Sequence, residues 1–191
     1  MKVRKIVILT AALTLAFGSA VFADTVTQKL KVFIDRKEAS DAGIMVDNKA
    51  YLAVGAFAKS LQAMVSWDND EKKVTIFKPN VHMITMKDNA TFGSVTSGRT
   101  QFLVFAQIDS LKTDISAFKV TITDPYGDET LIDGRDSGDK DFPSGKEDFW
   151  FKTKEISYDF TSKGQYLIRF WMKMNGDSSM QVVSEKVIAS K

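Results

Sequence analysis

Residues 31–77 have the sequence KVFIDRKEASDAGIMVDNKAYLAVGAFAKSLQAMVSWDNDEKKVTIF, and the hydrophobic period changes within it. Short apolar runs at 32–34, 44–46 and 50–52 predict three strands. Asp47-Asn48-Lys49, between the last two, consists of residues that tolerate left-handed backbone and predicts a tight turn. A short amphipathic helix is then predicted, because apolar residues recur at helical spacing: Val54, Phe57, Ala58 and Leu61.

A β-hairpin is predicted after this helix. Val65 and Trp67 alternate with a polar residue, residues 68–71 are turn formers, and Val74 and Ile76 alternate again. One helix on an antiparallel sheet is a small α+β domain, which we place at residues 28–80. Its expected core consists of six side chains: Phe57, Leu61, Val65, Trp67, Val74 and Ile76.

Residues 46–76 resemble the copper amine oxidase N-terminal-like domain, also called the stalk domain. The residues that carry the resemblance are Val46, Asp47, Tyr51, Leu52, Val54, Leu61, Val65, Trp67, Asp68, Val74, Thr75 and Ile76. Ala53, Gly55 and Gln62 depart from the Pro, Arg and Gly that the family usually has there. The resemblance implies a scaffold role, as an extracellular stalk or accessory module common in exported proteins of spore-forming Gram-positive bacteria.

The family name suggests copper, but the resemblance implies none. Copper and zinc sites use several imidazole or thiolate ligands, and this chain has one histidine, His82, and no cysteine. We therefore expect no copper and no other cofactor, with calcium as the one open alternative. His82 is interpreted as an edge or linker residue, and no disulfide can form.

Residues 1–23 have the pattern of a secretory signal peptide. A basic start at 2–5 precedes an apolar run at 6–17, and Val21-Phe22-Ala23 predicts cleavage after Ala23. An uncleaved anchor is the alternative, although the run is shorter than the roughly 20 residues that span a bilayer. We expect a secreted or cell-envelope-associated protein, with no membrane span after cleavage.

The charge of the chain after cleavage gives no case for a polyanionic partner. The remaining 168 residues carry 23 basic and 24 acidic side chains, a net charge of −1. Nucleic-acid binding would require a basic face, and anionic lipid would require a basic cluster. We therefore expect no nucleic-acid partner, and an envelope protein or a cell-wall polymer instead.

The rest of the chain predicts an all-β domain. Residues 81–88 are expected to be a linker or an extra strand, and residues 89–191 an immunoglobulin-like β-sandwich. Its predicted strands lie at 102–108, 118–122, 149–151, 156–160, 166–174 and 180–188. Tyr166 is either the corner tyrosine of such a sandwich or an ordinary core tyrosine.

An acidic segment, residues 133–141, is the candidate metal site. Calcium takes several oxygen ligands from a flexible loop, and four carboxylates recur here at short spacing: Asp133, Asp136, Asp139 and Asp141. The spacing is not that of an EF-hand, and Arg135 and Lys140 offset part of the charge. A solvated loop between strands is the alternative.

Exposed aromatic residues are the candidate ligand-binding groups. Trp171 lies between Arg169 and Lys173 on the polar face of its predicted strand, and Trp150 lies between two phenylalanines. The candidate ligand-binding residues are Trp171, Trp150 and Arg169. An exposed indole stacks on a sugar ring or packs on a partner domain. Both alternatives remain open.

No catalytic constellation stands out, since the chain has no thiol, no paired Ser and His motif and no Gly-rich phosphate loop. We therefore expect no enzyme but a non-catalytic extracellular or envelope accessory protein that acts through protein or envelope contacts. The alternatives are a carbohydrate- or wall-binding module that uses Trp171 and Trp150, and a calcium-dependent adhesion module.

Overall fold

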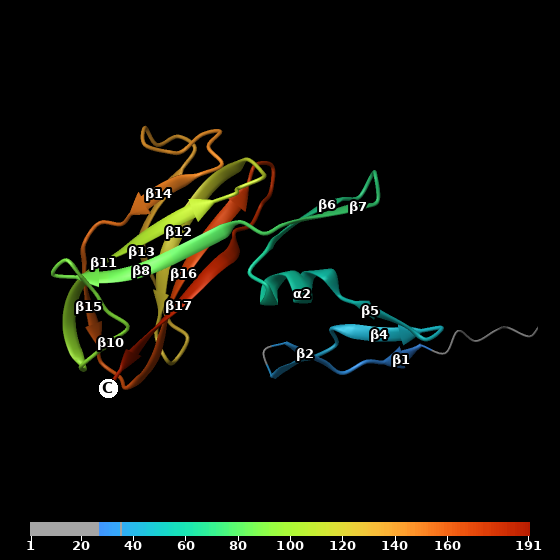
Figure 1. Ribbon diagram of the computed structural model, residues 1–191, viewed down its shortest axis with the longest axis horizontal. Coiled ribbons are helices and arrows are strands. Elements are labelled where there is room, and N and C mark those ends of the chain that lie inside the picture. The colour runs from blue at the N-terminus through green and yellow to red at the C-terminus, as the bar shows by residue number, and fades with distance from the viewer. Residues whose placement is uncertain (1–26, 35) are drawn as a thin grey trace, which may run out of the picture. The chain divides into compact units, whose positions relative to one another are not determined.

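The computed structural model describes residues 27–34 and 36–191 (Figure 1). The predicted signal peptide lies outside the described residues. Contacts divide the chain into two compact units, with the boundary between Ala53 and Val54. No helix in the described part is long and apolar enough to cross a membrane.

The first unit consists of short antiparallel strands. One sheet has the order β1-β4-β5, and β2 pairs separately with β3. Asp47 and Asn48 have φ angles of 48° and 59°, so the predicted left-handed turn joins β4 to β5. Besides the three predicted strands, this unit contains two more, β1 and β3. The strands are β1 (Gln28–Lys29), β2 (Val32–Ile34), β3 (Lys37–Ala39), β4 (Gly43–Val46) and β5 (Lys49–Leu52).

The second unit begins with the predicted helix and hairpin, which are confirmed as α2 (Val54–Ser60), β6 (Met64–Asp68) and β7 (Lys73–Phe77). Gln62 ends the helix with a φ of 54°. This left-handed position is one that glycine favours, which explains the Gly that the family usually has there.

The predicted core of this segment is wrong for five of its six residues. The helix buries only a small cluster of Ala58, Ala63 and Val65, with Val54 against it. A helix of seven residues presents about two turns, and Ala58 is the residue it buries against the hairpin. The side chains that stay exposed are Phe57, Leu61, Trp67, Val74 and Ile76.

Only Lys78 and Pro79 separate the hairpin from the strands of a two-sheet sandwich. The first sheet has the order β10-β17-β16-β12-β13, in which β10 and β17 are parallel and the other neighbours antiparallel. Its strands are β10 (Ser94–Val95), β12 (Ile115–Thr123), β13 (Glu129–Asp136), β16 (Gly164–Met174) and β17 (Gln181–Ser190).

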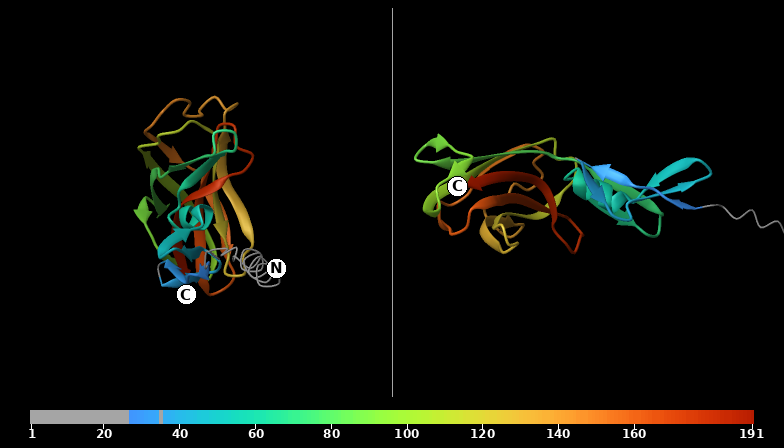
Figure 2. Two further views of the ribbon diagram at one scale, coloured as in Figure 1. Left: turned by 90° about the vertical axis from the view of Figure 1, so that its right-hand side faces the viewer. Right: turned by 90° about the horizontal axis from the view of Figure 1, so that it is seen from below.

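The second sheet has the order β14-β11-β8-β9, and β15 also pairs with β11. Its strands are β8 (Asn80–Lys87), β9 (Ala90–Thr91), β11 (Gly98–Asp109), β14 (Phe149–Lys152) and β15 (Ile156–Phe160). Figure 2 shows β8 and β11, in green, and β17, in red, in different layers. This arrangement is that of an immunoglobulin-like sandwich, with β12, β16 and β17 in the places of strands C, F and G.

The main core lies between these two sheets. As the alternation predicted, the residues of β11 and β16 that face inward are buried and those between them are at least partly exposed. Burial on one face is what gives a strand its period of two. The buried hydrophobic side chains of these two strands are Phe102, Val104, Ala106, Ile108, Tyr166, Ile168, Phe170, Met172 and Met174.

Tyr166 forms the corner. Its hydroxyl donates to the carbonyl oxygen of Ser162 at 3.1 Å and accepts from the Ser162 amide at 3.1 Å. The ring is buried against Phe160, with ring centroids 4.8 Å apart. The hydroxyl therefore pairs with the backbone four residues upstream, as the corner tyrosine of an immunoglobulin-like sandwich does.

We expect Tyr166→Phe to lower the free energy of unfolding by about 1–3 kcal/mol, because it leaves the Ser162 backbone without its partner. Tyr126→Phe is the matched control, since the exposed Tyr126 hydroxyl also contacts Ser162. Urea unfolding of the two variants checks this. Equal, small losses in both would contradict a structural role for the corner.

Candidate functional site

A groove of about 600 Å³ opens in the second unit, between the α2–β6 segment and the turn that joins β16 to β17. Two tryptophans, Trp67 and Trp171, line it together with polar side chains. The polar lining residues include Lys59, Asp177, Ser178 and Ser179.

Trp67 enters the groove from strand β6. It pairs with Val74 of β7 in the hairpin register, and 59% of the residue is exposed. Alternation along the strand correctly placed Trp67 on the same face as Val65, which was expected to be buried. The helix covers Val65 but not Trp67, so a side chain predicted to be core becomes a candidate binding group.

Trp171 enters from β16, on the outer face of its sheet, and is half-buried. Its indole Nε1 donates to Thr121 Oγ1 at 2.9 Å, and Lys119 Nζ lies 5.0 Å from the ring centroid. These two contacts hold the indole in one orientation. The sequence-based choice of Trp171 therefore falls on a residue that lines the groove.

Gln181 connects the two sides of the groove. Its Oε1 accepts from the Val65 amide at 2.9 Å, and its Nε2 donates to the Val65 carbonyl at 3.1 Å. The side chain thus pairs with β6 as a neighbouring strand would. Met64, next to Val65, is fully buried in the sandwich core. The hairpin strand β6 is therefore fixed to the sandwich on which Trp171 stands.

Arg169 does not line this groove. Its Nε donates to Glu185 Oε1 at 2.6 Å and its Nη1 to Thr123 Oγ1 at 2.9 Å. Both contacts lie along the outer face of the same sheet as Trp171. Arg169 is therefore close to Trp171 in sequence, but its guanidinium is bound to other residues of the sheet.

Trp150 lies elsewhere, on β14 of the second sheet, and is 72% exposed. Its ring is tilted against Phe105 with centroids 6.2 Å apart. It lines a second, open hollow of about 870 Å³ at the end of the sandwich, with five charged neighbours: Asp109, Lys140, Asp141, Lys146 and Asp148. The structure therefore does not bring Trp150 together with Trp171.

The acidic segment is partly strand, which corrects its prediction as a loop. Asp133 and Asp136 belong to β13, and Asp139 and Asp141 follow in a turn. The sequence of β13, ETLIDGRD, does not alternate regularly between apolar and polar residues, so it does not predict a strand. The segment is a strand because its backbone pairs with β12. Gly134 is required by close packing, since a Cβ there would lie 2.7 Å from the Phe118 carbonyl oxygen.

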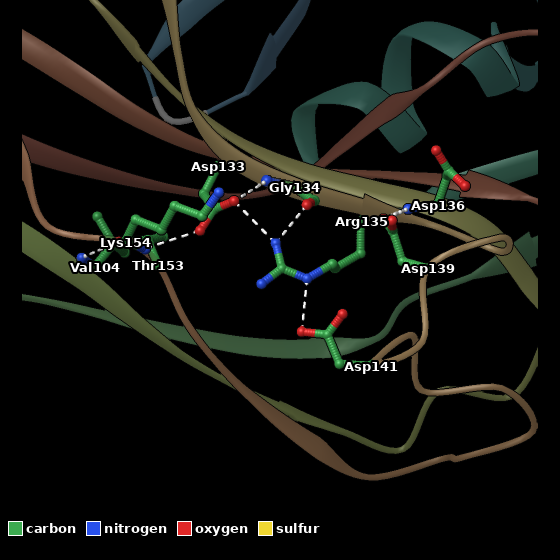
Figure 3. A network of polar contacts seen from close by, with 9 residues as sticks. All are labelled: Val104, Asp133, Gly134, Arg135, Asp136, Asp139, Asp141, Thr153 and Lys154. Carbon is green, nitrogen blue, oxygen red and sulfur yellow. Dashed lines mark hydrogen bonds and ion pairs between the residues drawn. The ribbon is translucent and has the colours of Figure 1, made fainter.

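Arg135 lies between two of the predicted calcium ligands (Figure 3). Its Nη1 donates to Asp133 Oδ1 at 2.9 Å and its Nε to Asp141 Oδ2 at 2.8 Å. The hydrogen bond with Asp141, followed by the contacts with Asp133, raises the pKa of Arg135, although its burial opposes the change. Its guanidinium lowers the pKa of Asp141.

The other two carboxylates also bind protein donors. Asp139 Oδ2 accepts from the Asp136 amide at 2.9 Å (Figure 3). Asp136 Oδ1 accepts from the Gly138 amide at 2.9 Å. Among the described residues, no group of three or more His, Cys, Asp or Glu side chains is arranged to hold a metal ion. The calcium hypothesis stays a prediction that this geometry does not favour. His82 is an exposed residue of β8.

Part of the chain matches a known protein family. Residues 33–100 match the family model of the copper amine oxidase N-terminal domain. The matched segment runs from β2 to the first residues of β11 and so contains Trp67. The chain has no match among curated proteins. Residues 33–100 are therefore similar to a non-catalytic domain family, and the chain continues as a two-sheet β-sandwich whose strand order is consistent with an immunoglobulin-like fold.

Proposed function

We propose that this protein is a non-catalytic accessory module that acts outside the cytoplasm, secreted or associated with the cell envelope. It works through contacts with an envelope protein or a cell-wall polymer. The observation that carries the proposal is the match of residues 33–100 to a non-catalytic domain family. The signal-peptide pattern of residues 1–23 supports the location.

A specific observation favours binding to a carbohydrate or the cell wall over a purely structural role. Trp67 and Trp171 share one groove. Exposed apolar side chains that gather at one place with polar residues around them mark a binding surface, whereas singly exposed ones do not. Two tryptophans from different strands that line one groove are not needed to cover a single sheet.

The test is retention of the purified chain without its predicted signal peptide, residues 24–191, on insoluble peptidoglycan, chitin and cellulose. We expect retention on at least one polymer, equally strong with calcium and with chelator, because protein donors already engage the four Asp carboxylates. A melting temperature that rises with calcium would instead reveal an ion site, by linkage. Failure to bind any polymer would contradict wall binding and direct the search to a protein partner.

A further inference from the structure

We propose that the groove between Trp67 and Trp171 binds a segment of a neutral glycan, whose sugar rings stack on the indoles. This inference rests on the proposed function and names the ligand class and the site. Nothing in the pattern around Trp67 identified it as a binding residue, because its alternation is that of a core residue. Its place in the groove depends on how the hairpin meets the sandwich.

The chemistry of the lining fits a sugar. A pyranose with equatorial hydroxyls exposes C–H groups on its ring faces, and the electron-rich indole face attracts such groups. Its hydroxyls need hydrogen-bond partners at the edge, which Ser178, Ser179 and Asp177 can supply. An apolar floor with a few polar groups is the general form of a small-ligand site.

The charges favour a neutral polymer over an anionic one. Lys59 and Asp177 are the charged lining residues, and their charges cancel. Lys119, which lies over Trp171, is paired with Glu129 at 3.1 Å. A site for a phosphate-rich or uronate-rich chain would need an excess of cations.

The groove is also held in shape before a ligand arrives. Gln181 ties β6 to the start of β17 by two hydrogen bonds, and Thr121 holds the Trp171 indole. Binding to a preformed site avoids the cost of ordering side chains. The Trp150 hollow differs, because its indole lies among charged side chains of both signs.

The experiment compares residues 24–191 with three variants: Trp67→Ala, Trp171→Ala and Trp150→Ala. Trp67 and Trp150 are both highly exposed, so neither substitution removes core packing and the two are a matched pair. The probes are insoluble chitin and cellulose, soluble chitotetraose and cellotetraose, and polygalacturonate as the anionic polymer. Binding of the soluble sugars is followed by tryptophan fluorescence, and thermal unfolding verifies the fold of each variant.

We expect retention on chitin or cellulose and a fluorescence change with the corresponding tetrasaccharide. Trp67→Ala should weaken binding about tenfold, which corresponds to the loss of one aromatic contact. Trp150→Ala should bind as the unsubstituted chain does, and Trp171→Ala should lose binding as Trp67→Ala does. Because half-buried Trp171 contributes to packing, Trp67→Ala is the deciding variant.

Three results would overturn the assignment. If Trp150→Ala abolishes retention and Trp67→Ala does not, wall binding stands and the groove is not its site. If polygalacturonate alone is bound, the ligand is not neutral. If no polymer or oligosaccharide is bound by the unsubstituted chain, both the glycan assignment and wall binding fail, and a protein partner remains for the accessory role.

Discussion

Replacing Asp133 with alanine is expected to lower the free energy of unfolding by about 3–5 kcal/mol, the usual cost of breaking a buried ion pair. The side chain is only 6% exposed. Its carboxylate accepts from the amides of Lys154 at 2.8 Å and Gly134 at 2.9 Å, and from Arg135. Since Lys154 follows β14 and Asp133 is in β13, the carboxylate joins the two sheets of the sandwich.

Thermal unfolding measures the effect, and we expect a decrease of about 10 °C in Tm for a chain of this size. Asp141→Ala is the control, because Asp141 pairs with the same Arg135 but is 67% exposed. Exposed ion pairs contribute about 0–1 kcal/mol. Equal losses in the two variants would show that the contact between the sheets is not what matters.

The stability of the protein at acid pH should depend on the same carboxylate, that of Asp133. Burial raises the pKa of Asp133, but the Lys154 and Gly134 amides and Arg135 outweigh it, so the pKa lies below its usual value. A lowered pKa adds stability above the unfolded value of about 3.9, and this is lost as pH falls through the folded pKa. Urea midpoints measured across acid pH should therefore fall less steeply in Asp133→Ala than in the unsubstituted chain.

Phe118→Ala is expected to cost about 3–5 kcal/mol, because it removes a large buried side chain and leaves a cavity. Phe118 is 2% exposed and packs against four phenylalanine rings at centroid distances of 4.8–6.0 Å. These partners come from both sheets and the loop between β13 and β14: Phe142, Phe149, Phe151 and Phe170.

Phe105→Ala is the matched control for this substitution. Phe105 lies on the outward-facing side of β11 and is half-buried against Trp150. Because surrounding water fills the space, we expect a loss of less than about 1.5 kcal/mol. Urea unfolding of both variants compares them. A Phe118→Ala loss no larger than that of Phe105→Ala would mean that the aromatic cluster rearranges to fill the cavity.

Local pattern was sufficient for most elements of this fold. Strands β11 and β16 followed from their alternation, because burial on one face imposes a period of two. The turn at Asp47-Asn48 followed from residues that adopt left-handed backbone, and their φ angles are positive. The resemblance of residues 46–76 to the family was visible from side-chain spacing alone, and the match of residues 33–100 agrees with it.

Pattern failed where order comes from a neighbour distant in sequence. Strand β13 shows no clear alternation, yet seven of its residues pair with β12. Helical spacing predicted burial for Phe57 and Leu61, but periodicity identifies a face and not whether anything covers it. Both side chains are exposed.

For the candidate site, too, some residues could be selected from sequence, but their arrangement could not. Trp171 and Trp150 could be selected from sequence, because each stands in a strand beside polar or aromatic residues. That Trp67 joins Trp171, while Trp150 lies elsewhere, depends on how the hairpin packs on the sandwich. The contacts between them are the burial of Met64 in the sandwich core and the two hydrogen bonds between Gln181 and Val65. Spacing along a chain carries no information on such pairings, since they form only when the hairpin packs on the completed sandwich.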